Sequence, residues 1–286
     1  MKKLTLLAVL VLACVLLASC NALLDKAKQY VTGNEASEKP ADYLASLKNE
    51  QFAYDVFKDH ISVTKYLAES VEAEIPSEID GKPVTEVGSL CFYQTEAKVV
   101  SVIIPESVTV IAESAFYCAD RLSSIVIPDS VTEIGMRAFA QCEMLETVVV
   151  GSGVSNIPDY CFNCCDSLKQ VTFRGQVGSF GARAFSYCNA LAEYEIPSSV
   201  NKIGARAFFG CASLEYLTFV NAKVEIGADA FSGSDKLALI APEGSAVYKY
   251  CEANSLRWTT SKSVPAVKLG IADESSEESS ASTEEN

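Results

Sequence analysis

The sequence has a single histidine and few basic residues, and both shortages narrow what the protein can do. His60 is the only histidine among 286 residues, so Ser-His-Asp and Cys-His mechanisms have almost no general base available. The 23 Lys and Arg residues are outnumbered by 37 Asp and Glu residues, which gives a net charge of −14. Without basic clusters, neither phosphate neutralisation nor counterion release favours binding to nucleic acid or to an anionic membrane surface. We therefore expect no nucleic-acid partner.

Candidate metal and catalytic groups are equally sparse. Cys161, Cys164 and Cys165 could seed a zinc or iron–sulfur site, but a structural zinc site needs four convergent ligands, and no second cluster or histidine lies nearby in the sequence. Glu193 and Glu195 could supply the two acids of a glycosidase. However, no long insertion provides a pocket, and like charges two residues apart on a strand are typical of a solvated face. We expect no metal, no cofactor and no enzymatic activity.

What the sequence does contain is a repeat of about 23 residues. A leucine follows the marker phenylalanine by six residues in six of the copies, from Leu122 to Leu237. The marker phenylalanines are separated by 24 residues once and by 23 residues five times, and they are Phe92, Phe116, Phe139, Phe162, Phe185, Phe208 and Phe231. A fixed period of this length indicates a solenoid.

Each repeat begins with an L-x-x-I-x-I pattern, such as Leu122, Ile125 and Ile127. This alternation predicts a short strand with its apolar members facing inward. A proline such as Pro128 follows the strand in several copies, and proline ends a ladder because it has no N–H donor. A Val and an Ile three residues apart come next, and the A-F-x-x-C segment after them predicts a short helix or turn. The expected fold is an α/β-type solenoid, a leucine-rich repeat array with one short strand per turn, capped at both ends.

One repeat position is occupied by cysteine in four successive copies, at Cys142, Cys165, Cys188 and Cys211. Equivalent positions stack at about 4.8 Å in a solenoid, so these residues should form a column. We interpret the column as a packing device, because a free cysteine behaves as a small buried hydrophobe. Disulfides between neighbouring turns remain open, since the same spacing falls within the Cα range that a disulfide requires.

The residues between the inward positions of each strand should form two exposed columns. The second column is apolar in its N-terminal half, whereas acidic residues and a tyrosine gather in the C-terminal half of the two columns. The candidate binding surface therefore consists of Ile103, Val126, Val149, Glu193, Glu195 and Tyr216. The alternative interpretation is that Ile and Val serve strand propensity and that the acids serve solubility.

The two ends of the chain differ from the repeats. Residues 1–19 have the charged start and apolar run of a secretory signal, and Leu17-Ala18-Ser19-Cys20 resembles a bacterial lipobox, which implies lipidation of Cys20. An ordinary signal or an uncleaved anchor is the alternative. We expect a tether at 20–40 and an N-terminal cap at 41–70, with a short helix near 41–50 and a hairpin turning near 58–60. Repeats at 71–240 and a C-terminal cap at 241–262 precede an acidic tail at 263–286, which should be disordered.

The frame I-P-x-S-V-T-x-I-G-x-x-A-F-x-x-C-x-x-L, present from Ile127 to Leu145, resembles the BspA-type leucine-rich repeats of bacterial surface proteins. The resemblance covers the chain from about Val71 to Leu237. It implies an exported, lipid-anchored protein of the bacterial cell surface that binds a protein ligand of the host matrix, a neighbouring cell or the envelope. Adhesion is the leading hypothesis, and a scaffolding role in the envelope is the second.

Overall fold

The computed structural model describes residues 39–95, 98–263 and 266–268. The predicted signal peptide, the predicted lipidation site Cys20, nearly all of the tether and most of the acidic tail lie outside these residues. The chain divides into two units, Met1–Tyr43 and Leu44–Asn286. In the described end of the first unit, the Tyr43 N–H donates to the Pro40 carbonyl at 3.0 Å. None of the helices in the described ranges is long and apolar enough to cross a membrane.

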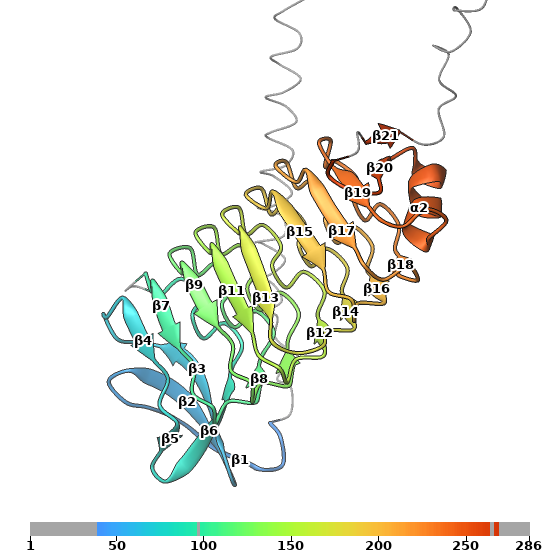
Figure 1. Ribbon diagram of the computed structural model, residues 1–286. Coiled ribbons are helices and arrows are strands. Elements are labelled where there is room, and N and C mark those ends of the chain that lie inside the picture. The colour runs from blue at the N-terminus through green and yellow to red at the C-terminus, as the bar shows by residue number, and fades with distance from the viewer. Residues whose placement is uncertain (1–38, 96–97, 264–265, 269–286) are drawn as a thin grey trace, which may run out of the picture. The chain divides into compact units, whose positions relative to one another are not determined.

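The second unit is a β-solenoid whose strands stack turn upon turn (Figure 1). Its long-strand face consists of β7 (Ser101–Ile103), β9 (Ser124–Val126), β11 (Thr147–Val150), β13 (Gln170–Phe173), β15 (Glu193–Ile196), β17 (Tyr216–Phe219) and β19 (Ala238–Ile240). Except between β13 and β15, neighbouring strands of this face pair in parallel and in register, so Val148 lies opposite Ile125 on one side and Val171 on the other. This arrangement confirms the predicted leucine-rich repeat solenoid and its 23-residue turn.

Each turn contains a second strand, which the prediction of one strand per turn missed. These short strands are β8 (Val110–Ile111), β10 (Glu133–Ile134), β12 (Asn156–Ile157), β14 (Ser179–Phe180), β16 (Lys202–Ile203) and β18 (Glu225–Ile226). They also pair in parallel, with Phe180 opposite Ile157 and Ile203. A strand of two residues is too short to show alternation, so only its inward Ile or Phe was visible in the sequence.

The A-F-x-x-C segments form turns, so the helix alternative for them was wrong. The residue before each segment and a residue within it have left-handed backbone angles, for example Arg137 at φ 59° and Gln141 at φ 60°. The N–H groups of Arg137, Phe139 and Gln141 donate to carbonyls of the next turn at 3.1, 3.0 and 2.7 Å. This third ladder satisfies backbone groups that a helix would have paired internally. Within the described residues the one α-helix is α2 (Ala246–Asn254), so the helical part of the predicted fold is small.

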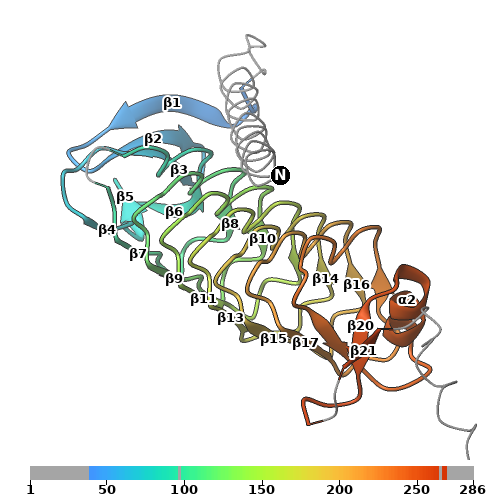
Figure 2. The same cartoon turned by 90° about the horizontal axis from the view of Figure 1, so that it is seen from above.

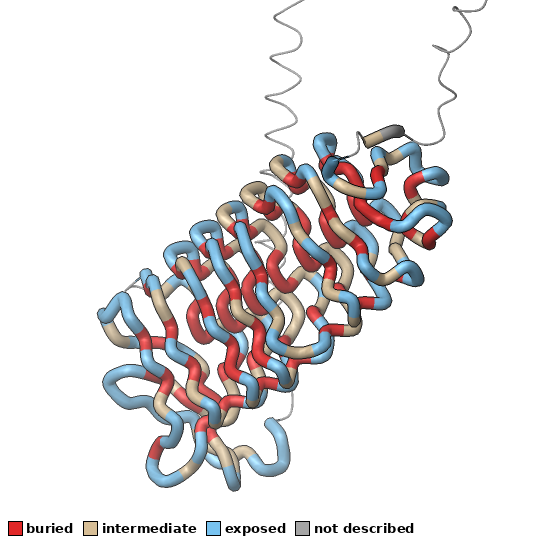
Figure 3. The backbone as a smooth tube through the Cα atoms, in the orientation of Figure 1, coloured by how far each residue is buried: buried red, intermediate tan, exposed pale blue. Residues whose placement is uncertain are grey.

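The core lies inside the coil, where the marker phenylalanines form a continuous stack. Buried positions recur at the same place in every turn (Figure 3). The rings of Phe116 and Phe139 lie 4.9 Å apart, and those of Phe185 and Phe208 lie 5.2 Å apart, all with nearly parallel planes. Such pairs add about 0.5–1.5 kcal/mol each beyond the area that they bury.

The N-terminal segment adds strands to the start of the array. β2 (Phe52–Phe57) and β3 (Ile61–Tyr66) are antiparallel, which confirms the predicted hairpin. β1 (Tyr43–Lys48) is a strand where we expected a short helix, because its backbone joins the sheet in the order β1-β2-β3-β6-β8-β10. The remaining elements before the first long strand of the repeats are β4 (Glu72–Glu74), β5 (Glu78–Ile79) and β6 (Lys82–Val87).

The C-terminal end of the array is covered by α2, β20 (Arg257–Thr259) and β21 (Val267–Lys268), as Figure 2 shows along the stack of turns. Ser245 is the N-cap of α2, and its hydroxyl accepts the Tyr248 N–H. Val247 and Cys251 are the buried residues of this helix, and the Tyr250 hydroxyl donates to the Gly227 carbonyl at 3.3 Å. The helix therefore packs its small apolar side on the last turn.

Candidate binding surface

The apolar half of the predicted surface lies on three neighbouring strands of one sheet. Val126 of β9 is paired with Val149 of β11, and Ile103 is the last residue of β7, the next strand along. Ile103 is 62% exposed and Val126 is 49% exposed, whereas Val149 is half-buried. The three side chains alternate with buried neighbours, which places them on the outside of the coil.

Sequence reasoning missed two further exposed apolar residues at the start of these strands. Val71 precedes β4 and Val100 precedes β7, and the Val100 N–H donates to the Val71 carbonyl at 2.7 Å. Both residues occupy the position directly after the leucine of the L-x-x-I-x-I frame, which the two predicted outward columns did not include. They extend the exposed apolar surface to the start of the array.

The acidic half of the predicted surface lies on β15 and β17. Glu193 is paired with Tyr216, and Glu195 is paired with Thr218. Both carboxylates are exposed, and the tyrosine is half-buried. The structure therefore brings Glu193 and Tyr216 side by side on adjacent strands, as the repeat register predicts.

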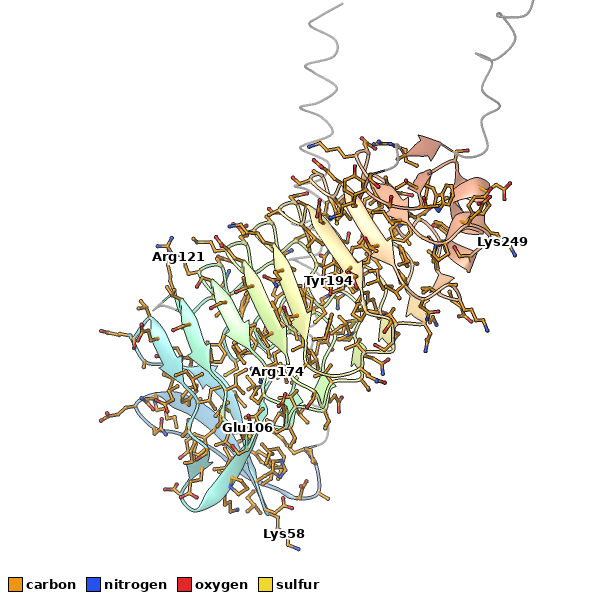
Figure 4. All side chains as sticks on the ribbon, in the orientation of Figure 1. Lys58, Glu106, Arg121, Arg174, Tyr194 and Lys249 are labelled. Carbon is orange, nitrogen blue, oxygen red and sulfur yellow. The ribbon has the colours of Figure 1, made fainter. Side chains whose placement is uncertain are left out.

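The two halves belong to different sheets. The first sheet has the order β13-β11-β9-β7-β4 and the second has the order β15-β17-β19-β20-β21, with no ladder between β13 and β15 in the described residues. Tyr194, labelled in Figure 4, stands at this break and occupies an inward position that is Val171 in the preceding turn and Leu217 in the following one. Its ring packs near Phe185 and Phe208, and its hydroxyl donates to the Val171 carbonyl at 3.3 Å. The Tyr194 side chain thus forms a hydrogen bond with a backbone carbonyl of β13.

The acidic half is in contact with the chain's own C-terminal segment. The Lys262 ammonium forms an ion pair with the Glu193 carboxylate, although the two residues are 69 positions apart. The same ammonium lies 5.8 Å from the centroid of the Tyr216 ring, which is within the range of a cation–π interaction. Nothing in the repeat pattern indicated this contact, because Lys262 lies beyond the last repeat.

The four column cysteines are buried free thiols, together with most other cysteines in the described residues. The Cys165 thiol donates to the Phe139 carbonyl at 3.1 Å, and Cys188 donates in the same way to Phe162 at 3.3 Å. Burial raises the pKa of the Cys188 thiol well above its usual value and raises the pKa of Cys211 to about 12. Ser234 follows at the same repeat position, and its hydroxyl donates to the Phe208 carbonyl at 2.9 Å. The column is therefore a set of hydrogen-bonded core residues.

The single histidine lies in the turn between β2 and β3. His60 Nδ1 is 2.9 Å from Asp59 Oδ1, and the ring stacks on Phe57 at 4.4 Å. Hydrogen bonding to His60 holds the pKa of the exposed Asp59 carboxyl below its usual value. The cysteines of the repeats lie elsewhere in the fold, inside the coil.

Comparison with known proteins gives the same class of fold. A T. pallidum leucine-rich repeat protein of known structure is 27% identical over 70% of this chain and 84% of its own, with a TM-score of 0.51. A leucine-rich repeat protein from Eubacterium ventriosum is 24% identical over 69% of this chain and 51% of its own, with a TM-score of 0.58. A search of curated protein sequences finds no match.

The fold and these relatives define a leucine-rich repeat solenoid. The sequence profile of the BspA type leucine-rich repeat region matches residues 74–154 and 110–238, which together span more than half of the 286 residues. The chain belongs to the BspA-type leucine-rich repeat family.

Proposed function

We propose that this protein is an exported, lipid-anchored protein of the bacterial cell surface that binds a protein partner, as an adhesin does, through its long-strand face. The single observation that carries the proposal is the exposure of apolar side chains on adjacent paired strands, at Ile103 and Val126. Contiguous exposed apolar surface is typical of an interaction site, and desolvated apolar residues are typical centres of such sites. Solenoids bind partners through faces of this kind.

The anchoring part of the proposal rests on the sequence. The lipobox-like string ends at Cys20, and lipid on this cysteine would tie the protein to a membrane. The proposed role is not catalytic, since His60 is held in a hairpin turn by Asp59 and Phe57. The buried thiols are poor nucleophiles as well, because burial disfavours the thiolate that would react.

The proposal is tested with two double variants of a soluble form that lacks residues 1–20. Val126→Asp with Val149→Asp places charge at the centre of the apolar half, whereas Glu193→Lys with Glu195→Lys inverts the acidic half. We expect each double variant to remain folded and to lose binding to a panel of matrix proteins or to whole cells. An interface of standard size buries about 800 Å² per partner, which several adjacent turns can supply.

Matched controls place the same changes elsewhere on the solenoid. Val220 is 56% exposed and lies just after β17, so Val220→Asp adds an aspartate outside the apolar half. Glu133→Lys with Glu225→Lys makes the charge inversion on the short strands. If the surface variants bind like these controls, the site lies elsewhere on the molecule. If the unmodified protein binds envelope components and no external partner, scaffolding within the envelope replaces adhesion.

A further inference from the structure

We propose that Glu193 and Tyr216 form a recognition site for a lysine side chain of a basic partner segment, and that Lys262 of the same chain occupies this site until the partner displaces it. The inference rests on the proposed use of the long-strand face for protein binding. It adds the chemical class of the partner, a basic segment, and names Lys262 as a residue of the same chain that competes with this partner.

Two groups on neighbouring strands meet the Lys262 ammonium. Glu193 offers a carboxylate and Tyr216 offers a ring face, and strand pairing sets the two residues opposite each other on β15 and β17. A carboxylate satisfies the charge of an ammonium, while the ring attracts the same cation through its quadrupole. This combination favours a cationic side chain over a neutral or acidic one.

A lysine of the same chain, Lys262, already lies against these two groups. Lys262 Nζ contacts the Glu193 carboxylate and lies 5.8 Å from the Tyr216 ring centroid. The lysine follows β20, and its segment is shaped by local hydrogen bonds, including Thr259 Oγ1 to the Ser261 carbonyl at 2.9 Å. The contact with Lys262 therefore shows that the two groups accommodate a lysine ammonium group.

The contact between Lys262 and Glu193 is weak enough for another cation to displace Lys262. The Lys262 and Glu193 side chains are 52% and 51% exposed, and solvent screening leaves little net attraction in an exposed ion pair. Glu195 and Glu215 lie beside this site without an ion-pair partner among the described residues, so further cations of a basic segment would find carboxylates there. Charge complementarity thus commits the site to a partner segment with several lysines.

The test measures binding of a fluorescein-labelled hexalysine peptide to the full soluble chain by anisotropy at low and at physiological salt. We expect Lys262→Ala to tighten binding by about two- to fivefold, which is the range that an exposed ion pair can supply. Glu193→Gln and Tyr216→Leu should weaken it. In the double variant Lys262→Ala with Glu193→Gln, the gain from removing Lys262 should vanish.

Controls separate this site from the general negative charge of the protein. Glu225→Gln removes one charge on the short strands, and Lys202→Ala removes one lysine there; both should leave binding close to that of the unmodified chain. A hexalysine peptide with acetylated side chains should not bind. The inference is overturned if Glu193→Gln and Glu225→Gln weaken binding equally, or if Lys262→Ala changes nothing more than Lys202→Ala does. Neither result decides the proposed protein-binding function, which is tested separately with matrix proteins and without a basic peptide.

Discussion

Individual residues of the core carry the stability of this solenoid, and Phe185 is the clearest case. Its ring is 1% exposed and lies between the rings of Phe162 and Phe208 at 5.5 and 5.2 Å, with the Phe180 ring at 5.0 Å. Phe185→Ala should lower the free energy of unfolding by about 3–5 kcal/mol, because it leaves a cavity in the stack. Urea unfolding followed by circular dichroism measures the change. The half-buried Phe209 provides the comparison, and equal losses at both positions would contradict the register of the repeats.

The buried thiols give a prediction in pH. The pKa of Cys211 is raised by burial from 9.0 to about 12, so above pH 9 the unfolded state loses this proton while the folded state keeps it. The stability contributed by the buried thiol is therefore complete below pH 9 and is lost as pH rises toward 12, at about 1.4 kcal/mol per pH unit. Cys211→Ser should flatten the alkaline decline by that amount, since serine does not titrate there.

Unfolding at pH 8, 9 and 10 in the presence of a reductant measures this difference. Ser234 shows that a hydroxyl is accommodated at the same repeat position, so the variant should fold. The native protein should also react slowly with a bulky thiol reagent and should release its column thiols on denaturation without prior reduction. Parallel alkaline curves for the two proteins would show that the Cys211 thiol does not titrate differently in the folded and unfolded states.

At the scale of the elements, the break between β13 and β15 should be visible as local opening. The Tyr194 hydroxyl donates a hydrogen bond to the Val171 carbonyl, and no ladder joins β13 and β15 in the described residues. Amides of Glu193–Ile196 should therefore exchange hydrogen faster than those of Thr147–Val149, which are paired on both sides. Exchange followed by mass spectrometry compares the two strands directly. Equal protection would mean that the ladder continues through Tyr194.

The secondary-structure elements also show how much of the fold can be predicted from the sequence alone. The long strands were predictable because inward residues alternate, and the phenylalanine stack was predictable because the period is strict. The two-residue strands carry no alternation, and Arg137 and Gln141 adopt left-handed angles that their residue types do not indicate. In the candidate site, repeat register placed Glu193 opposite Tyr216, but the contact with Lys262 depends on a segment outside the period.

For the whole molecule, the proposed lipid anchor at Cys20 would decide where the long-strand face is presented. Cys20→Ala should abolish incorporation of labelled fatty acid and should change the detergent partitioning of the protein. Each buried CH₂ group of an acyl chain contributes about 0.8 kcal/mol to membrane binding, so the shift in partitioning should be large. Replacing Cys251, which is a buried residue of α2, serves as the control for loss of a cysteine. Absence of label from the unmodified protein would contradict lipidation at Cys20.

The three inter-turn ladders also determine how such an array can change in length during evolution. In the middle of the solenoid, a turn donates from Arg137, Phe139 and Gln141 to the next turn and receives equivalent bonds at its own carbonyls from the turn before. Duplication of one 23-residue unit would therefore meet matching donors and acceptors on both sides, and each copy would lengthen the array by about 4.8 Å. The caps would need no change. An array of this kind can thus gain or lose whole turns while the chemistry between turns stays the same.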